Sequence, residues 1–392
     1  MSDRDEIEIA ELLEKLDGGG PLLVLDVRNA DEYEGWKIEG RRQFDIAHIP
    51  YFDFIEDEEA AAARVPKTGS EIVVVCAKGG SSQMVAEILR DAGLSARSLA
   101  GGMIAYGQYL ESVKVPLRET EEKFFEISQL NRRGKGCLSY IVISGGEAAV
   151  IDPSRAVEIY ESQLARAGAR LVHVLDTHVH ADHLSGGPAL AAKLGADYFV
   201  GAGAGFGLRH RIRALNDGDE LRVGNIAIRL LATPGHTPGS VCYLVGDRYL
   251  LTGDTLFKTS VGRPDLGGQV EEWSKSLFQT LRARIGRLDD ATVVLPAHYA
   301  DISEIGLDGV VSAKLGELRR DLPELRMTES ASFIEAMRRA LGTPPPQYAE
   351  IIDTNLGNKD IDSEHAIEWE LGKNQCAASG GPAAQSREAR VR

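Results

Sequence analysis

The stretch VLDTHVHADHLSGG, residues 174–187, decides the fold, because it places four metal-binding side chains directly after an apolar strand. His178, His180, Asp182 and His183 lie within six residues, and imidazole and carboxylate at this density suit a divalent metal. Alternate positions of an extended segment point the same way, so His178 and His180 are predicted to converge on one ion. Asp182 and His183 would face a neighbouring position.

Three further candidates each lie where a strand is expected to stop. His236 stands in the turn ATPGHTPGS, Asp254 ends the apolar run RYLLTGD, and His298 follows the apolar run VVLPA. Strand ends on one side of a sheet meet in space, so these side chains are expected to join the four of the first motif. A carboxylate such as Asp254 is costly to bury unless a cation offsets its charge, which makes a metal ligand the simplest interpretation.

The pattern of HxHxDH with downstream His, Asp and His resembles the metallo-β-lactamase superfamily over roughly residues 120 to 305. The resemblance implies an αββα sandwich of two sheets with helices outside, and all seven ligand positions of the superfamily are filled in this chain. Sites of this kind host both two-zinc hydrolases and one-iron dioxygenases, so this resemblance alone leaves the chemistry open.

The loop GRPD, residues 262–265, favours a one-iron dioxygenase over a two-zinc hydrolase, because it resembles a segment of the persulfide dioxygenases. That resemblance implies one Fe(II) ion held by His178, His236 and Asp254, with open positions for a thiol persulfide and O2. It also implies a surrounding shell that orients the ligands, namely His180, Asp182, His183 and His298. Zn(II) is the alternative metal.

Two features near this loop have more than one interpretation. Arg263 either holds the loop through Asp265 or meets an anionic substrate. Cys376 lies in a tail that resembles members of the same group, and we interpret it as structural because the sequence sets no basic neighbour beside it.

The N-terminal part is predicted to be an α/β domain with a parallel sheet. PLLVLDV and EIVVVC are typical of strands, and SSQMVAEILRDAG is typical of a helix that ends at Gly93. Cys76 ends the second strand, and Lys78 and Gly79 follow it in the loop before the helix. Backbone N–H groups of such a loop can stabilise a thiolate or a persulfide anion, which favours a reactive role for Cys76.

The surroundings of Cys76 resemble a rhodanese domain over about residues 5 to 112, carried by LLVLDVRNADEYEGWKIEG and LAGGMIAYGQYL. The resemblance implies that Cys76 is the catalytic residue and carries a sulfane sulfur taken from thiosulfate or passed to sulfite, in a direction that the sequence leaves open. Many active rhodaneses carry arginine five residues after the cysteine, where this chain has Ser81.

The two resemblances converge on one substrate class. Rhodanese chemistry moves a sulfane sulfur, and persulfide dioxygenase chemistry oxidises it to sulfite, so we expect a fused sulfurtransferase and persulfide dioxygenase. The alternatives are a two-zinc thioesterase of the glyoxalase type that hydrolyses an acylglutathione, and a non-catalytic rhodanese module on a hydrolase.

Composition is that of an ordinary globular protein, with 392 residues, 43% hydrophobic residues and a formal net charge of −15. This charge argues against nucleic acid as a partner. We expect no signal peptide, no membrane span and no disulfide framework among the four cysteines, and hence a cytoplasmic protein that could form a homo-oligomer.

The expected organisation has five parts. They are a rhodanese-like domain (3–113), a linker (114–122), a metallo-β-lactamase-fold domain (123–305), a helical C-terminal extension that packs on it (306–376) and a disordered tail (377–392).

Overall fold

The computed structural model describes residues 5–204, 209, 212–342, 344, 347–374 and 376. The expected disordered tail, 377–392, lies outside these residues. Within them, every helix is too short or too polar to cross a bilayer.

The chain divides by its contacts into two compact units. The first holds the residues up to 111, together with 132–135 and 371–373, and the second holds most of the rest. Residues 111–114 form strand β6, so the start of the expected linker is a strand in the structure. The expected domain limits remain predictions.

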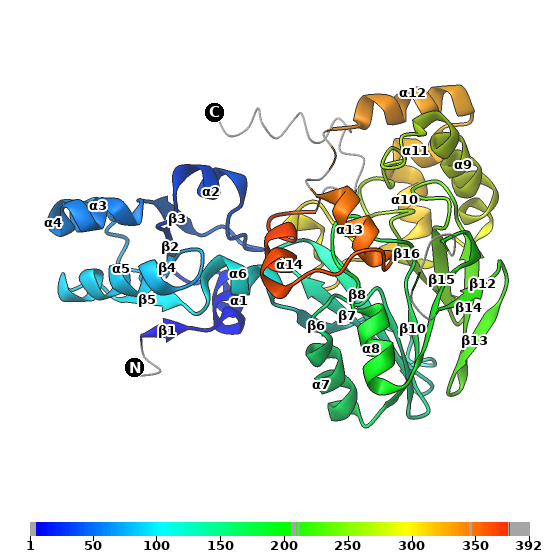
Figure 1. The fold of residues 1–392 in the computed structure, drawn as a ribbon, viewed down its shortest axis with the longest axis horizontal. Coiled ribbons are helices and arrows are strands. Elements are labelled where there is room, and N and C mark those ends of the chain that lie inside the picture. The colour runs from blue at the N-terminus through cyan, green and yellow to red at the C-terminus, as the bar shows by residue number, and fades with distance from the viewer. Residues whose placement is uncertain are drawn as a thin grey trace. The chain divides into compact units, whose positions relative to one another are not determined.

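The first unit is built on a five-stranded sheet in the order β1-β5-β4-β2-β3, in which every neighbouring pair is parallel (Figure 1). The strands are β1 (Glu6–Ile7), β2 (Leu22–Asp26), β3 (Asp45–His48), β4 (Glu71–Val75) and β5 (Ala96–Leu99). The helices are α1 (Ile9–Gly18), α2 (Ala30–Gly35), α3 (Tyr51–Glu56), α4 (Glu58–Ala63), α5 (Gly80–Asp91) and α6 (Gly102–Gln108).

Both faces of this sheet are buried, which explains the continuous apolar runs of its central strands. Leu22 and Val24 of β2 belong to one core cluster, whereas Leu23 and Leu25 belong to another. Side chains alternate between the two faces of a strand, so the two clusters lie on opposite faces. The expected α/β domain with a parallel sheet is confirmed.

The second unit contains two sheets. The larger has the order β12-β11-β10-β9-β8-β7-β6, and the smaller has the order β13-β14-β15-β16-β17-β18. The larger sheet contains β6 (Glu111–Lys114), β7 (Glu126–Arg132), β8 (Cys137–Ser144), β9 (Glu147–Ile151), β10 (Arg170–Leu175), β11 (Asp197–Gly201) and β12 (Arg213–Leu215). The smaller contains β13 (Glu220–Val223), β14 (Ile226–Ala232), β15 (Val241–Val245), β16 (Tyr249–Gly253), β17 (Val293–Pro296) and β18 (Ala313–Lys314).

A single apolar core joins these two sheets face to face. Ile151 and Leu175 of the larger sheet belong to the same buried cluster as Leu230, Tyr243 and Leu295 of the smaller sheet. Because the inner faces of the two sheets share one core, the second unit is a β-sandwich.

Helices cover the sandwich on the outside, so the expected αββα fold with helices after it is confirmed. The helices of this unit are α7 (Val157–Ala167), α8 (Gly187–Leu194), α9 (Val270–Ala283), α10 (Leu315–Asp321), α11 (Pro323–Arg326), α12 (Ser330–Ala340), α13 (Tyr348–Asn355) and α14 (Ser363–Trp369). Short 3-10 turns lie at η1 (Ala202–Ala204), η2 (Ile285–Arg287) and η3 (Ile302–Glu304).

The helices after residue 305 share a core with the smaller sheet. Phe333 and Met337 of α12 pack in one buried cluster with Leu277 of α9 and Leu244 of β15. Figure 1 shows α12 running beside α9 on the outside of the sandwich. Burial of this apolar face is what holds the first part of the C-terminal extension on the unit.

Candidate metal centre

The ends of five strands supply the candidate metal ligands. Asp152 follows β9, the 178–183 motif follows β10, His236 lies in the turn between β14 and β15, Asp254 follows β16, and His298 follows β17. The strand-end argument thus places the side chains in one region, and their detailed contacts divide them into groups.

Three buried side chains form the first group. His178, His236 and Asp254 each offer a ligand atom within 4.8 Å of the others. Asp254 Oδ2 lies 3.7 Å from His178 Nε2 and 3.6 Å from His236 Nε2. None of these three atoms has a hydrogen-bond partner among the described residues. Buried polar atoms without partners are costly, so this set fits a bound divalent cation.

Each of the three candidate ligands is held by a hydrogen bond at its other polar atom. His178 Nδ1 lies 3.0 Å from Thr177 Oγ1, which in turn donates to Asp152 Oδ2 at 2.9 Å. His236 Nδ1 donates to the backbone oxygen of Arg263 at 2.8 Å. A histidine whose Nδ1 carries the proton presents a bare Nε2, which is the form that binds a metal.

The two carboxylate oxygens of Asp254 have different surroundings. Oδ1 accepts a hydrogen bond of 2.6 Å from His298 Nδ1, while Oδ2 points to the two unpartnered imidazole nitrogens. His298 therefore orients Asp254 and leaves one oxygen for a cation.

The direction of the pKa shift separates the two candidate ligand histidines from their neighbours. Burial lowers the pKa of His178 well below the ordinary imidazole value, and the nearby His180 lowers it further. Burial also lowers the pKa of His236. Burial raises the pKa of Asp254, but His298 and His178 outweigh it and hold the value below its usual range. The group is thus two neutral imidazoles and one carboxylate near neutral pH.

The neighbouring histidines His298 and His180 have raised pKa values instead. Burial lowers the pKa of His298, but Asp182 and Asp254 outweigh burial and raise it well above the ordinary value. Asp152 likewise outweighs burial at His180 and raises its pKa to about 9. Without a metal, both rings are cationic partners of carboxylates.

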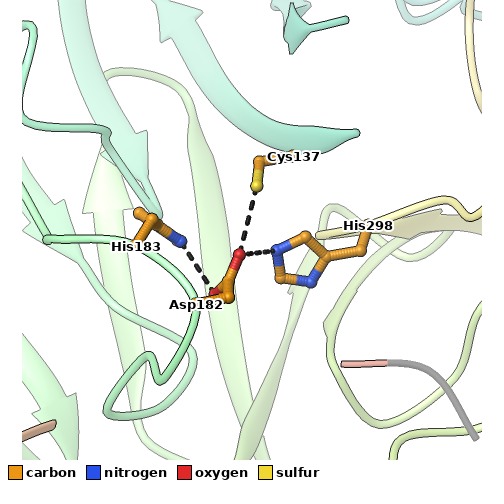
Figure 2. Close-up of side chains that lie close together, drawn as sticks. All are labelled: Cys137, Asp182, His183 and His298. Carbon is orange, nitrogen blue, oxygen red and sulfur yellow. Dashed lines mark hydrogen bonds and ion pairs between the residues drawn. The ribbon is translucent and has the colours of Figure 1, made fainter. Parts of the chain in front are cut away.

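A second buried cluster gathers around Asp182, as Figure 2 shows. Asp182 Oδ1 pairs with His183 Nδ1 at 3.0 Å, and Oδ2 lies 2.9 Å from His298 Nε2. Cys137, the first residue of β8, donates its thiol to the same Oδ2 at 3.2 Å. This cluster could hold a second cation, because His298 Nε2, although it lies beside Asp182 Oδ2, has no hydrogen-bond partner among the described residues.

His180 differs from the prediction made from alternation. It lies outside the group of His178, and its Nε2 meets Asp152 Oδ1 at 3.2 Å instead. The chain turns directly after β10, so the two side chains do not follow the geometry of a strand. His180 Nδ1 has no hydrogen-bond partner among the described residues.

The GRPD loop is braced by its own charged pair. Arg263 donates to both oxygens of Asp265 at 2.7 Å and to the backbone oxygen of Gly342 at 2.9 Å. Arg263 is also buried, with an exposed fraction of 3%. Of the two interpretations of Arg263, the geometry supports the one in which it holds the loop, and the loop in turn holds His236.

The C-terminal extension reaches the metal-binding motif, which the sequence did not predict. Asn355 Nδ2 donates to the backbone oxygens of His180 and His183, both at 2.9 Å. Its Oδ1 accepts from the backbone N–H of Ser185 at 2.9 Å. Glu370 accepts from the backbone N–H of Leu184 at 2.7 Å. These bonds fix the backbone of the motif from outside the sandwich.

Cys376 also lies at the centre. Its sulfur is within 4.8 Å of ligand atoms of Asp254 and His298, and the residue is completely buried. Its backbone oxygen accepts from the N–H of Arg263 at 3.2 Å. The sequence offered little sign of this, because Cys376 is more than 100 residues from Asp254 along the chain.

The first unit holds the other predicted reactive residue. Cys76 follows β4, and the backbone N–H of Gly79 donates to its sulfur at 3.0 Å. Ser82 Oγ lies 3.2 Å from the same sulfur. Gly79 has φ 102°, a value that an L side chain rarely adopts, so glycine is required for this approach. Lys78 is exposed. The sulfur-carrying role of Cys76 stays a prediction.

Comparison with known families agrees with this architecture. A model described as the metallo-beta-lactamase superfamily matches residues 132–298, and one described as the rhodanese-like domain matches residues 8–108. The chain belongs to the metallo-beta-lactamase superfamily. It carries a rhodanese-like domain before that fold.

Similar proteins include enzymes of two kinds. The chain is 37% identical over 165 residues to a hydroxyacylglutathione hydrolase of Acidiphilium cryptum, spanning 42% of this chain and only 65% of that protein. It is 33% identical over 209 residues to the mitochondrial persulfide dioxygenase ETHE1 of Homo sapiens, spanning 52% of this chain and 76% of that protein. The crystal structure of ETHE1 from Myxococcus xanthus aligns with a TM-score of 0.52 and 28% identity, over 59% of this chain and 99% of that one.

Proposed function

We propose that the chain is a persulfide dioxygenase that oxidises a low-molecular-weight thiol persulfide, such as glutathione persulfide, and that its rhodanese-like domain transfers sulfane sulfur. The overall reaction is RSSH + O2 + H2O → RSH + SO3²⁻ + 2 H⁺. The observation that carries the proposal is the group of His178 Nε2, His236 Nε2 and Asp254 Oδ2, three buried atoms without partners among the described residues.

Two histidines and one carboxylate are the ligand set of mononuclear iron oxygenases, since such a set leaves positions open for substrate and O2. Fe(II) bound there would supply O2 activation and a positive charge for the persulfide anion. Asp182 supports a single-ion interpretation, because three side chains engage it, whereas His298 Nε2 has no hydrogen-bond partner among the described residues and does not discriminate between one ion and two.

The chain's own residues then orient the ligands. Thr177 sets the tautomer of His178, and the backbone oxygen of Arg263 sets the tautomer of His236. Arg263 and Asp265 keep that oxygen in place through their ion pair. The centre is enclosed, since each of the three side chains is no more than 2% exposed, and enclosure strengthens the electrostatic interactions inside it.

In the rhodanese-like domain, Cys76 would take a sulfane sulfur from thiosulfate and release sulfite, or run the same exchange in reverse. The N–H of Gly79 is placed to stabilise negative charge on its sulfur, while the Ser82 hydroxyl donates to the backbone oxygen of Gly79 and so braces this loop.

The test is O2 uptake with glutathione persulfide by anaerobically purified, iron-loaded protein, with sulfite measured in parallel. We expect one sulfite per O2, loss of both signals in Asp254→Ala, and no change in Asp247→Ala, an exposed aspartate in the β15–β16 turn. An iron-containing protein that consumes no O2 would contradict the proposal.

The second candidate is a two-zinc thioesterase that acts on an acylglutathione. It is favoured by the hydroxyacylglutathione hydrolase relative and by the second cluster of Cys137, Asp182, His183 and His298. Two metal ions per chain together with thioester hydrolysis would support it against the dioxygenase.

A further inference from the structure

The last described residues of the chain lie beside the candidate metal centre. Asn374 Nδ2 donates to the backbone oxygens of Gly136 and Tyr299, both at 3.2 Å. Cys376 follows, held by the bond from the Arg263 N–H to its backbone oxygen. These contacts bring a thiol from the C-terminal extension to the ends of strands that carry the ligands.

The sulfur of Cys376 lies beside the ligand group but is not part of it. With Asp254 and His298 it forms a separate candidate metal-binding group whose ligand atoms lie within 4.8 Å of one another, whereas the group of His178, His236 and Asp254 does not include it. A persulfide on Cys376 would extend this side chain by one S–S bond of about 2.05 Å. The second sulfur would therefore reach beyond the position of the thiol.

The polar atoms beside this sulfur fit a bound ion. Asp254 Oδ2 and the Nε2 atoms of His178 and His236 are all buried and have no hydrogen-bond partner among the described residues. Cys376 is itself completely buried, and its sulfur is a free thiol.

The other two buried cysteines of this unit have different surroundings. Cys137 donates to Asp182, which already pairs with two histidines (Figure 2). Cys242 lies inside β15, where its thiol donates to the backbone oxygen of Thr252 at 3.6 Å. Cys376 is thus the cysteine placed to present sulfur to the ligand group.

We propose that Cys376 is an acceptor thiol, and that the species oxidised at the centre is a persulfide of the chain itself rather than a free small-molecule persulfide. The inference rests on the proposed function and names its immediate substrate. It assigns Cys376 a covalent role in place of the structural one predicted from the sequence.

The chemistry balances without a further reactant. In the first step, the Cys376 sulfur attacks the outer sulfur of RSSH, so the S–S bond of RSSH breaks, a new S–S bond forms on Cys376, and RSH leaves with one proton. In the second step, Cys376-SSH + O2 + H2O yields Cys376-SH + SO3²⁻ + 2 H⁺. The thiol is regenerated, and the sum is the reaction proposed above.

The experiment separates loading from oxidation by withholding O2. Full-length, iron-loaded protein is mixed with glutathione persulfide without O2, alkylated, digested and measured by peptide mass spectrometry. We expect one extra sulfur atom on the Cys376 peptide, lost with release of one sulfite when air is admitted. Cys242→Ser, a buried cysteine away from the ligands, is the matched control and should load as the wild type does.

Two variants, Cys376→Ser and Cys376→Ala, complete the test. Both should keep the iron content, because Cys376 is outside the ligand group, and both should lose about 100-fold in kcat/KM for sulfite release. A Cys376 peptide without the extra sulfur atom would overturn the inference. Variants that release sulfite at the wild-type rate or faster would also overturn it, and Cys376 would then have only a structural role. Oxygen uptake by the wild-type protein tests the proposed function separately, so the two failures are distinguishable.

Discussion

Asn355→Ala tests whether the C-terminal extension sets the metal affinity from a distance. The amide of Asn355 makes three hydrogen bonds to the backbone of the motif, at the oxygens of His180 and His183 and at the N–H of Ser185. Three such bonds at about 1 kcal/mol each set an upper limit of about 3 kcal/mol. Water can replace some of them, because the site of these bonds is only partly buried.

We therefore expect the substitution to weaken metal binding by about 1.4 to 2.7 kcal/mol, which is about 10- to 100-fold. The assay is competition for the metal against a chelator of known affinity, on full-length protein. Asn358→Ala is the matched control, because Asn358 bonds only to Asp353 among the described residues, near the same helix and away from the motif.

An Asn355→Ala protein with unchanged metal affinity would refute the reasoning, since it would mean that the motif holds its shape without the extension. Urea unfolding of the same protein checks that a weaker affinity does not come from a general loss of stability.

Three other substitutions probe separate parts of the chain. Gly262→Ala should abolish metal binding, because its Cβ would lie 1.8 Å from the backbone oxygen of Asp254, whereas Gly18→Ala, with open space around it, should leave the metal content unchanged. Cys76→Ser should abolish sulfur transfer from thiosulfate to cyanide with full metal content, and retained transfer would contradict the role of Cys76. Phe333→Ala should cost about 3 to 5 kcal/mol in urea unfolding, because the ring is fully buried, while Phe52→Ala at an exposed position should cost little.

The sequence was sufficient for the fold class and for the region of the site. Apolar runs gave the strands, and the rule that strand ends meet brought His236, Asp254 and His298 to the motif. Side-chain alternation along a strand did not predict that His178 and His180 belong to different groups. The chain turns after Leu175, so the His180 side chain points towards Asp152. Asp152 could have been found, since it follows an apolar strand as Asp254 does.

The contribution of the C-terminal extension could not have been predicted from local patterns. Asn355 is 172 residues from His183, and Glu370 is 186 residues from Leu184. Both lie in a tail that resembles members of the same group, but each acts on backbone atoms of its partner, which leave no signature in side-chain type. Only the folded structure joins them.

Because Asn355 lies far after His183 in the sequence, the hydrogen bonds between them can form only late in protein synthesis. A ribosome adds about 5 to 20 residues per second, so Asn355 follows His183 by about 9 to 34 s. Throughout that interval, the motif exists without the bonds that fix its backbone, and Cys376 is made later still. A metal ion that bound before Asn355 was synthesised would bind a motif whose backbone is not yet held by these hydrogen bonds. We therefore expect stable metal binding only after the C-terminal extension has packed on the unit.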